Sequence, residues 1–434
     1  MPSLSPSLLS PSLTSSQSSS ANSPKSRVGG RIFDAQPLNR YNQAMQSKDL
    51  LTRRVANILP TKDGLADLMD KKKIRLYQGF DPTGGKLHLG HSVGIRKLMD
   101  FANAGHEVIF LFGTGTVLAG GGDPSGRETG RKMITQEEID ENIKGWKDQV
   151  TPLVDWDKIT IKQNGDWLVP LTLKEILEIA GYISAVQLFK RDMFQRRIEH
   201  GDSVTAAETF YPLLQGYDSV FMDVDLEIGG TDQEFNMLIG RELMKKMKGK
   251  EKHILVTPMI MGTDGKEMHK SVGNCVWLDD TAEDMFGKLM ALSDEHITTY
   301  MELVTDIPLE HIREVEKGIT DEKLHPMEAK KELALDVARQ FHGQEKAEEA
   351  QSMWESTFQK REIPTDIPTH KLNGEENIVD ILVNSGTVSS KSEARRLIEQ
   401  GGIELDGVKV ADPTTNLDSA STLRIGKHRF LKVQ

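Results

Sequence analysis

Short apolar runs alternate with longer amphipathic stretches along the first part of the chain. The runs have the length and composition of buried strands, and they lie at residues 74–80, 108–112, 159–162, 226–230 and 254–260. Between them lie stretches of helical periodicity, some of which open with a Thr-x-x-Glu capping box, at Thr135/Glu138, Thr172/Glu175 and Thr205/Glu208. Strands separated by helices predict an α/β fold with a mostly parallel, doubly wound sheet.

The pattern changes after residue 271. Helical patterns then follow one another without a strand signal, at residues 281–292, 294–303, 310–317 and 326–351. They predict a separate α-helical domain. Residues 363–370 contain Pro364 and Pro368 and are typical of a linker. A short helix, a Gly-Gly turn and a hairpin pattern then predict a small α+β module that ends at residue 434.

The N-terminal tail differs from the rest in composition. It is rich in Ser and has no acidic residue before Asp34, so it cannot bury enough apolar surface to fold. We expect residues 1–47 to be disordered. Ser-rich, basic, acid-poor tails are also found as organellar transit peptides, so an organelle is the alternative to the cytoplasm.

Composition excludes few functions. A chain of 434 residues with 37% hydrophobic and 27% charged residues fits a globular protein of about three domains. The single Cys275 excludes an internal disulfide and a cysteine-based zinc cluster. A net charge of -11 leaves an RNA partner possible, because nucleic acid is bound by local basic patches. No apolar run is long enough to predict a transmembrane helix.

The first candidate for chemistry is the stretch Tyr77-Gln-Gly-Phe-Asp81-Pro-Thr83-Gly-Gly-Lys-Leu-His88-Leu-Gly-His91. It leaves a predicted strand, turns on glycines and enters a predicted helix near His91. Such a junction presents free backbone N–H groups and the positive end of a helix, which suits phosphate. Two histidines three residues apart can donate hydrogen bonds to a nucleoside triphosphate there. By itself, His-x-x-His is more typical of an ordinary strand-to-helix turn with incidental histidines.

A second group of polar residues lies in a segment that we expect to be buried. Tyr211, Gln215 and Asp218 have the spacing of one helical face. Apolar neighbours such as Leu213 and Phe221 indicate that this segment faces the interior. Buried polar groups need partners, so the pattern predicts a ligand.

These motifs, in this order, resemble the class I aminoacyl-tRNA synthetases in the form of bacterial-type tyrosyl-tRNA synthetases. Gly-Phe-Asp-Pro-Thr followed by His-Leu-Gly-His is similar to the family's "HIGH" signature. Residues 265–271, Gly-Lys-Glu-Met-His-Lys-Ser, resemble its "KMSKS" loop. Lys270 and Ser271 match that loop, whereas Glu267 replaces its first lysine and Lys266 comes directly before. The resemblance covers residues 48–434.

The resemblance implies a role for each matching residue. Those that position ATP or stabilise charge on the departing pyrophosphate are Thr83, His88, His91, Arg127, Arg131, Lys266 and Lys270. Those that bind the tyrosine substrate are Tyr77, Asp81, Asp123, Asn164, Tyr211, Gln215, Asp218 and Gln233. Those that bind ATP are His88, Gly90, His91, Gly230, Asp232, Lys270 and Ser271. Tyr77 and Asp218 would share the phenol hydroxyl, which phenylalanine lacks.

The resemblance also implies an architecture. A doubly wound, Rossmann-type class I catalytic domain would span residues 48–271, and an α-helical tRNA anticodon-binding domain residues 272–360. A linker, 361–371, would lead to a small α+β domain of ribosomal-protein type, 372–434, which binds RNA. Adjacent Arg395 and Arg396 on its predicted helix are the candidates for tRNA contacts.

The implied reaction has two steps. Tyrosine and ATP give tyrosyl-adenylate and pyrophosphate, and the tyrosyl group then passes to the 3′ end of tRNA(Tyr). ATP is a substrate that brings Mg²⁺ with it, without a dedicated metal site on the protein and without zinc. A homodimer without membrane contact is expected.

Two alternatives remain open from the sequence. A tryptophanyl-tRNA synthetase shares the fold but gives no reason to pair Tyr77 with Asp218. The chain is also compatible with an RNA-binding protein whose catalytic site has decayed, and Glu267 in the loop favours that alternative.

Overall fold

The computed structural model describes residues 50–120, 134–266, 268, 273–358, 367–372, 374–388, 390–426 and 429–434. The predicted disordered tail, 1–47, lies outside these residues.

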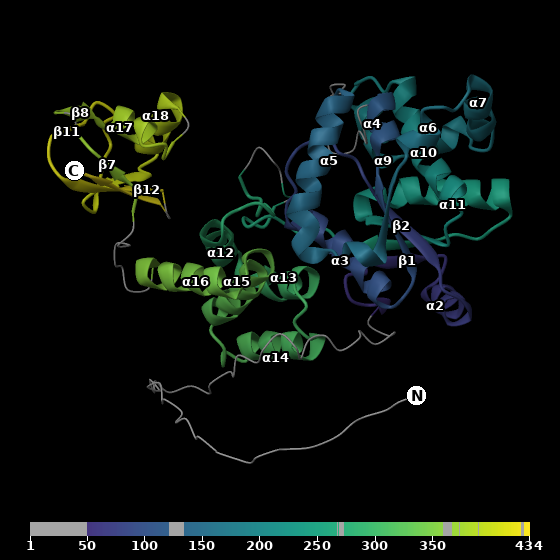
Figure 1. The fold of residues 1–434 in the computed structure, drawn as a ribbon, viewed down its shortest axis with the longest axis horizontal. Coiled ribbons are helices and arrows are strands. Elements are labelled where there is room, and N and C mark those ends of the chain that lie inside the picture. The colour runs from purple at the N-terminus through teal and green to yellow at the C-terminus, as the bar shows by residue number, and fades with distance from the viewer. Residues whose placement is uncertain are drawn as a thin grey trace, which may run out of the picture. The chain divides into compact units, whose positions relative to one another are not determined.

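The first part of the described chain is built on a six-stranded sheet with the strand order β1-β6-β5-β2-β3-β4 (Figure 1). Its strands are β1 (Asn57–Leu59), β2 (Arg75–Phe80), β3 (Glu107–Phe112), β4 (Ile159–Gln163), β5 (Leu226–Gly230) and β6 (His253–Thr257). All neighbours from β6 to β4 pair in parallel, and β1 alone pairs antiparallel, with β6. The doubly wound parallel sheet is confirmed.

The five predicted strands are present, with ends that differ by a few residues. The last apolar run is the largest difference, because its strand ends at Thr257 and not at residue 260. Pro258 explains this, since proline has no N–H to donate to the sheet. The sequence missed β1, because three residues are too few to show a periodicity.

Helices cover the sheet on both sides. In this part of the chain they are α2 (Lys62–Lys71), α3 (Leu89–Asn103), α4 (Thr114–Gly120), α5 (Gln136–Val150), α6 (Gly165–Leu168), α7 (Leu173–Gly181), α8 (Ala185–Leu188), α9 (Asp192–Glu199), α10 (Ala206–Met222) and α11 (Glu234–Lys248). The three predicted capping boxes all form, at the starts of α5, α7 and α10. Each N-terminal threonine accepts the N–H of the glutamate three residues on, as the pattern predicts.

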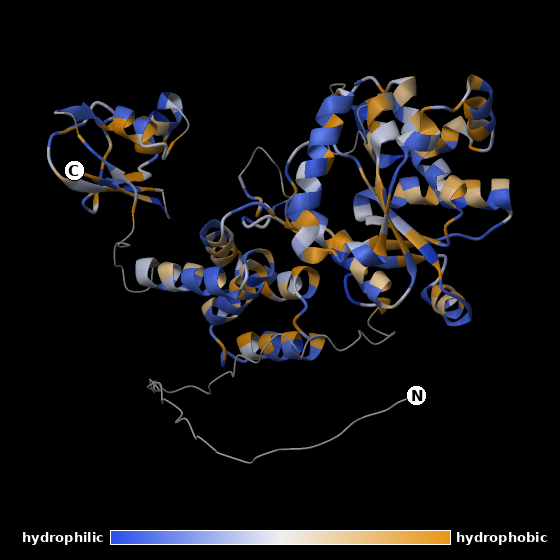
Figure 2. Cartoon of the chain, in the orientation of Figure 1, coloured by the Kyte–Doolittle hydropathy of each residue, from blue (hydrophilic) through white to orange (hydrophobic). Residues whose placement is uncertain are grey.

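Alternate residues of the central strands enter two different cores. Val108, Phe110 and Phe112 of β3 join the larger core with α3, whereas Ile109 and Leu111 join a smaller one with Tyr77 and α10. Figure 2 shows the apolar colouring of these central strands. Burial on both faces explains why the strands appear in the sequence as continuous apolar runs.

The following segment is helical, as predicted. Its helices are α12 (Ala282–Met290), α13 (Ile297–Val304), α14 (Leu309–Thr320), α15 (Pro326–His342) and α16 (Gln344–Phe358). The predicted single helix over 326–351 is wrong. It is divided at Gly343, whose φ of 86° lies outside helical geometry and is readily adopted by glycine. Apolar residues of these helices belong to the same core as α3 and the sheet.

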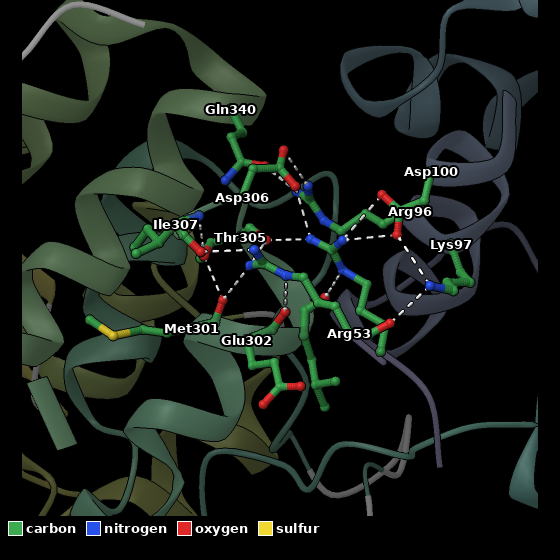
Figure 3. A network of polar contacts seen from close by, with 12 residues as sticks. Arg53, Arg96, Lys97, Asp100, Met301, Glu302, Thr305, Asp306, Ile307 and Gln340 are labelled. Atoms are coloured by element: carbon green, nitrogen blue, oxygen red, sulfur yellow. Dashed lines mark hydrogen bonds and ion pairs between the residues drawn. The ribbon is translucent and has the colours of Figure 1, made fainter. Parts of the chain in front are cut away.

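A buried arginine cluster, Arg53, Arg54 and Arg96, joins the sheet-containing part to the helical part (Figure 3). Arg53 donates to the backbone carbonyls of Glu302 (3.0 Å), Ile307 (2.8 Å) and Thr305 (2.6 Å). Its burial lowers the pKa of Arg53 to about 10. Arg54 and Arg96 both bond to the carboxylate of Asp306. Because Arg96 lies on α3, the helix that begins at the histidine motif is tied directly to the helical part.

The C-terminal residues form a second sheet and a separate core. The sheet has the strand order β10-β9-β12-β13-β7, from β7 (Thr369–His370), β9 (Ile403–Leu405), β10 (Val408–Lys409), β12 (Ser421–Ile425) and β13 (Arg429–Val433). Strands β8 (Glu376–Asn377) and β11 (Asn416–Leu417) form a pair, and the helices are α17 (Ile378–Asn384) and α18 (Lys391–Glu399). Strand β7 lies inside the segment 361–371 that we expected to be a linker, and it pairs with β13. The sequence did not predict this strand, because two residues next to Pro368 are too few to show a strand pattern.

Candidate active site

A cavity of about 180 Å³ lies at the carboxyl end of β2, where ligands bind in sheets of this type. It brings together residues from β2, β3, β5 and α10 and from the segments that follow β3, β4 and β5. The predicted tyrosine-site residues that line it are Tyr77, Asp81, Asn164, Tyr211, Gln215, Asp218 and Gln233, and His91 of the histidine motif joins them. Residues separated by more than a hundred positions therefore share one pocket.

Both histidines of the motif form the start of α3. His88 is the N-cap residue, and its Nδ1 accepts the N–H of Gly90 (3.2 Å). His91 Nδ1 accepts the N–H of His88 (3.1 Å). Because both Nδ1 atoms act as acceptors, the neutral rings carry their proton on Nε2. The helix thus begins two residues earlier than predicted, and its cap holds both imidazoles in the donor form that phosphate requires.

Asp218 is the most deeply buried carboxylate of the pocket, with 2% of its surface exposed. Asn164 Nδ2 donates to one oxygen (3.1 Å) and Trp167 Nε1 to the other (2.8 Å). Burial raises the pKa of Asp218 well above its ordinary value, and these two donors oppose that rise. The two donors also hold the carboxylate in one orientation, in which it can accept a further hydrogen bond from a group in the pocket.

Tyr77 is fully buried, and its hydroxyl lies 2.9 Å from Ser219 Oγ. Burial, together with Glu227 and Asp218, raises the pKa of its phenol well above the ordinary value, so the hydroxyl stays protonated. Both Tyr77 and Asp218 line the pocket.

At another part of the same cavity, Asp81 is held by two hydroxyls. Tyr211 donates to Asp81 Oδ2 (2.8 Å), and Thr116 Oγ1 donates to Asp81 Oδ1 (2.9 Å). Gln215 donates to Glu227 (3.0 Å), and its amide oxygen accepts from Asn236 (3.0 Å). A carboxylate, a phenol oxygen and an amide oxygen together form a site suited to an ammonium group.

The predicted ATP-binding residues after β5 lie in the turn that leads to α11. Gly230 ends β5, and Asp232 and Gln233 form the 3-10 helix Thr231–Gln233. Gln233 Nε2 donates to Asp232 Oδ2 (2.8 Å). A Cβ atom on Gly230 would lie 2.5 Å from Asp232 Oδ1, so any larger residue there would displace this carboxylate. Thr83 lies in the turn after β2, where its N–H donates to the carbonyl of Asp81 (2.7 Å).

Several predicted residues lie outside the described residues: Asp123, Arg127, Arg131, Glu267, Lys270 and Ser271. Lys266 is described and exposed, and its backbone N–H donates to Asp264 Oδ1 (3.1 Å). Arg395 and Arg396 are exposed on α18, next to the buried Ala394 that fixes the helix on its core.

Three pocket-related residues were missed from the sequence. Trp167 orients Asp218, Ser219 contacts Tyr77, and Gln78 lines the cavity. The buried Gln78 Oε1 has no hydrogen-bond partner among the described residues, so it is available to accept a hydrogen bond. In the sequence, only its position next to Tyr77 in the predicted strand could have indicated that Gln78 belongs to the site.

Among the described residues, no His, Cys, Asp and Glu side chains form a cluster of three or more suited to a metal ion. No helix among them is long and apolar enough to cross a membrane. A larger cavity of about 550 Å³ is lined by Thr52, Arg53 and residues of α13 and α14, and it contains none of the predicted site residues.

Comparison with known proteins agrees with the resemblance seen in the sequence. Residues 69–359 match the family of class I tRNA synthetases (W and Y), and residues 359–431 match the tyrosine–tRNA ligase SYY-like C-terminal domain. The chain is 41% identical to the tyrosine–tRNA ligase of Thermotoga maritima over 388 residues, 88% of this chain and 96% of the relative. It is 39% identical to that of Aquifex aeolicus over 389 residues, 88% and 97% of the two chains.

Solved structures show the same fold at lower identity. A C-terminally truncated mitochondrial tyrosyl-tRNA synthetase from Coccidioides posadasii superposes with a TM-score of 0.58 at 23% identity, covering 70% of this chain and 90% of that one. The tyrosyl-tRNA synthetase of Archaeoglobus fulgidus, solved with L-tyrosine, gives a TM-score of 0.56 at 22% identity, covering 70% and 98%.

Proposed function

Since the chain belongs to the tyrosine–tRNA ligases of class I, we propose how its own residues carry out the family's reaction. The activity is the activation of tyrosine by ATP to tyrosyl-adenylate and pyrophosphate, followed by transfer of the tyrosyl group to tRNA.

The tyrosine substrate occupies the cavity at the end of β2. Its phenol hydroxyl donates to Asp218 and accepts from Tyr77, while its ammonium lies among Asp81, Tyr211 and Gln215. Support comes from the lining of one cavity by all five side chains. Phenylalanine has no hydroxyl to meet Asp218 and Tyr77 in the pocket, and sites built to hydrogen-bond a substrate hydroxyl discriminate by about 10⁴–10⁵, a value known for enzymes of this family.

ATP lies over the start of α3, where His88 and His91 donate from Nε2 and Asp232 accepts from the ribose. Support comes from the cap geometry, which directs both Nδ1 atoms to the backbone. No side chain acts as nucleophile, because the tyrosine carboxylate itself attacks the α-phosphate. The protein therefore contributes positioning and donors for the developing charge, from Thr83, the histidines, Lys266, Lys270 and the arginines Arg127 and Arg131. Mg²⁺ enters with ATP, held mainly by phosphate oxygens.

Transfer RNA is bound by the parts that follow the catalytic domain, with the boundaries expected from the sequence. The helical part, 272–360, would bind the anticodon arm, and the C-terminal domain would add phosphate contacts through Arg395 and Arg396. Support comes from the separate C-terminal core and from the exposure of both arginines.

The protein would act as a homodimer in the cytoplasm. Large apolar side chains are exposed along residues 169–186, among them Leu173 (72%), Val186 (71%) and Val169 (64%). Exposed apolar surface of this kind favours an interface between subunits. Leu173→Glu combined with Val186→Glu should convert a dimer to a monomer in light scattering.

The observation that carries the proposal is the buried Asp218 with two aimed donors, beside Tyr77, in a pocket at the end of β2. The test is ATP–pyrophosphate exchange by the purified chain with tyrosine, phenylalanine or tryptophan. Exchange that depends on tyrosine supports it. Exchange with tryptophan would favour the related synthetase, and no exchange would favour a decayed catalytic site.

A further inference from the structure

Behind Tyr77 lies a second layer of buried polar groups that the reaction scheme does not use. Lys252, directly before β6, has an ammonium group with no exposed surface. Its Nζ lies 2.9 Å from Ser219 Oγ, and Ser219 Oγ lies 2.9 Å from the Tyr77 hydroxyl. Lys252, Ser219 and Tyr77 thus form a continuous chain of hydrogen bonds that ends at the tyrosine pocket.

The ammonium is accommodated by a close crossing of two helices. A Cβ atom on Gly240 of α11 would lie 2.6 Å from Lys252 Nζ. A Cβ atom on Gly216 of α10 would lie 3.0 Å from the Cα atom of Gly240. Both glycines therefore leave the space in which the charge lies. A lysine ammonium is costly to bury, so this position needs compensation.

Glu227 of β5 supplies that compensation. Its Oε2 pairs with Lys252, and both side chains are almost fully buried, with 0% and 2% exposed. Its Oε1 accepts from Gln215 (3.0 Å), a residue of the ammonium site. The ion pair is therefore connected to the pocket by two routes, through Ser219 to Tyr77 and through Gln215.

The donors and acceptors favour one direction for the chain. A lysine ammonium has three donors and no acceptor, so Ser219 Oγ must accept from it. The single Ser219 proton then has two possible acceptors, Tyr77 at 2.9 Å and Glu227 Oε2 at 3.3 Å. The shorter contact favours Tyr77. If Ser219 donates to Tyr77, the Tyr77 proton can go to the Gln215 carbonyl, 3.4 Å away, or to a substrate hydroxyl in the pocket, and a closer substrate hydroxyl makes the better acceptor.

We propose that Lys252 and Ser219 are positioning residues for substrate selection. The hydrogen-bond chain runs from the Lys252 ammonium through Ser219 and Tyr77 to the substrate phenol, and ends at the Asp218 carboxylate. Every link donates in the same direction, from a cation to an anion, so each bond polarises the next. Only an amino acid with a hydroxyl completes the chain. This inference rests on the proposed function of the pocket.

The test is a double-mutant cycle with Ser219→Ala and Tyr77→Phe, measured by ATP–pyrophosphate exchange. Ser219→Ala leaves the Lys252–Glu227 pair in place and removes only the connecting hydroxyl. Loss of one hydrogen bond should lower kcat/KM for tyrosine about fivefold to tenfold and leave that for phenylalanine within about twofold. With Tyr77→Phe already present, Ser219→Ala should change kcat/KM for tyrosine by less than about twofold, since the two residues act in one chain.

Two further variants separate positioning from structural support. Ser92→Ala deletes another buried serine hydroxyl, which donates to the Leu89 carbonyl (2.7 Å). It should leave the tyrosine-to-phenylalanine ratio unchanged. Lys252→Met/Glu227→Gln removes both charges together and should lower the ratio as Ser219→Ala does, again only when Tyr77 is present.

Equal loss for tyrosine and phenylalanine, or a full Ser219→Ala effect in the Tyr77→Phe background, would overturn the inference. If circular dichroism shows that Ser219→Ala does not fold, the same cycle is measured with Lys252→Met/Glu227→Gln in place of Ser219→Ala. An equal loss for both amino acids, or a full effect in the Tyr77→Phe background, then overturns the inference in the same way. Absence of tyrosine-dependent exchange in the unmodified chain would instead contradict the proposed function itself.

Discussion

Replacing Trp167 with phenylalanine should shift the pH dependence of tyrosine activation. Trp167 Nε1 donates to Asp218 Oδ1 at 2.8 Å, and its ring stacks on Phe221 with centroids 4.6 Å apart. Phenylalanine keeps an aromatic ring in that stack but removes the donor. Because the N–H stabilises only the ionised carboxylate, its loss raises the pKa of Asp218 further.

The size of the effect follows from the burial of the pair. Asp218 is 2% exposed, so water can replace the lost donor only poorly. A hydrogen bond to a charged group contributes about 1.5–3 kcal/mol, and one pH unit corresponds to about 1.4 kcal/mol. The acid limb of kcat/KM for tyrosine should therefore move upward by about one to two pH units. Below that limb Asp218 is protonated, and a neutral carboxyl group accepts the hydrogen bond from the tyrosine phenol only weakly.

The assay is ATP–pyrophosphate exchange at low tyrosine concentration across the acidic range, because kcat/KM reports the free enzyme. Trp146→Phe is the matched control. Its indole N–H donates to the neutral carbonyl of Gly84, so the acid limb should stay in place. Coincident acid limbs for Trp167→Phe and the unmodified chain would show that Asp218 is not the acceptor on which activation depends.

Other predictions follow from the same structure. Tyr77→Phe should lower selectivity for tyrosine over phenylalanine by about tenfold in the exchange assay, since one buried donor to the phenol is lost; unchanged selectivity would remove Tyr77 from the pocket's function. Arg53→Ala should lower the free energy of unfolding by about 2–4 kcal/mol in urea denaturation, because several buried carbonyls lose their donor; a loss below about 0.5 kcal/mol would contradict this. Lys266→Ala should slow adenylate formation in single-turnover measurements with little change in tyrosine affinity, whereas a rate increase in Glu267→Lys alone would favour a weakened loop. Arg395→Ala and Arg396→Ala should each reduce the salt dependence of tRNA binding by about one unit of slope without changing exchange, and an unchanged slope would exclude phosphate contacts there.

The features that the sequence predicted well depend on local signals. Parallel strands buried on both faces give continuous apolar runs, and capping boxes mark helix starts within four residues, so β2 to β6 and the starts of α5, α7 and α10 were predictable. Gly343 was not recognised as a helix end, because a single glycine inside a helical pattern is also tolerated. The two-residue strand β7 has no pattern of its own and exists only because β13 pairs with it.

In the pocket, too, only the residues with a local sequence pattern could be predicted. Tyr211, Gln215 and Asp218 share one helical face, so their convergence followed from spacing. The role of Trp167 could not be predicted from spacing, because Trp167 lies on α6, 51 positions from Asp218 in the chain. Lys252 appears in the sequence as one lysine in a charged loop. Its burial depends on two glycines that face each other across α10 and α11, and no local pattern carries that information.

The most direct test of the account is the effect of Asp218→Ala on tyrosine and phenylalanine measured side by side by ATP–pyrophosphate exchange. If Asp218 accepts the phenol hydroxyl, kcat/KM for tyrosine should fall by about tenfold to a hundredfold or more, while that for phenylalanine should not fall. Retention of normal tyrosine activation by Asp218→Ala, or an equal fall for both amino acids, would contradict the account.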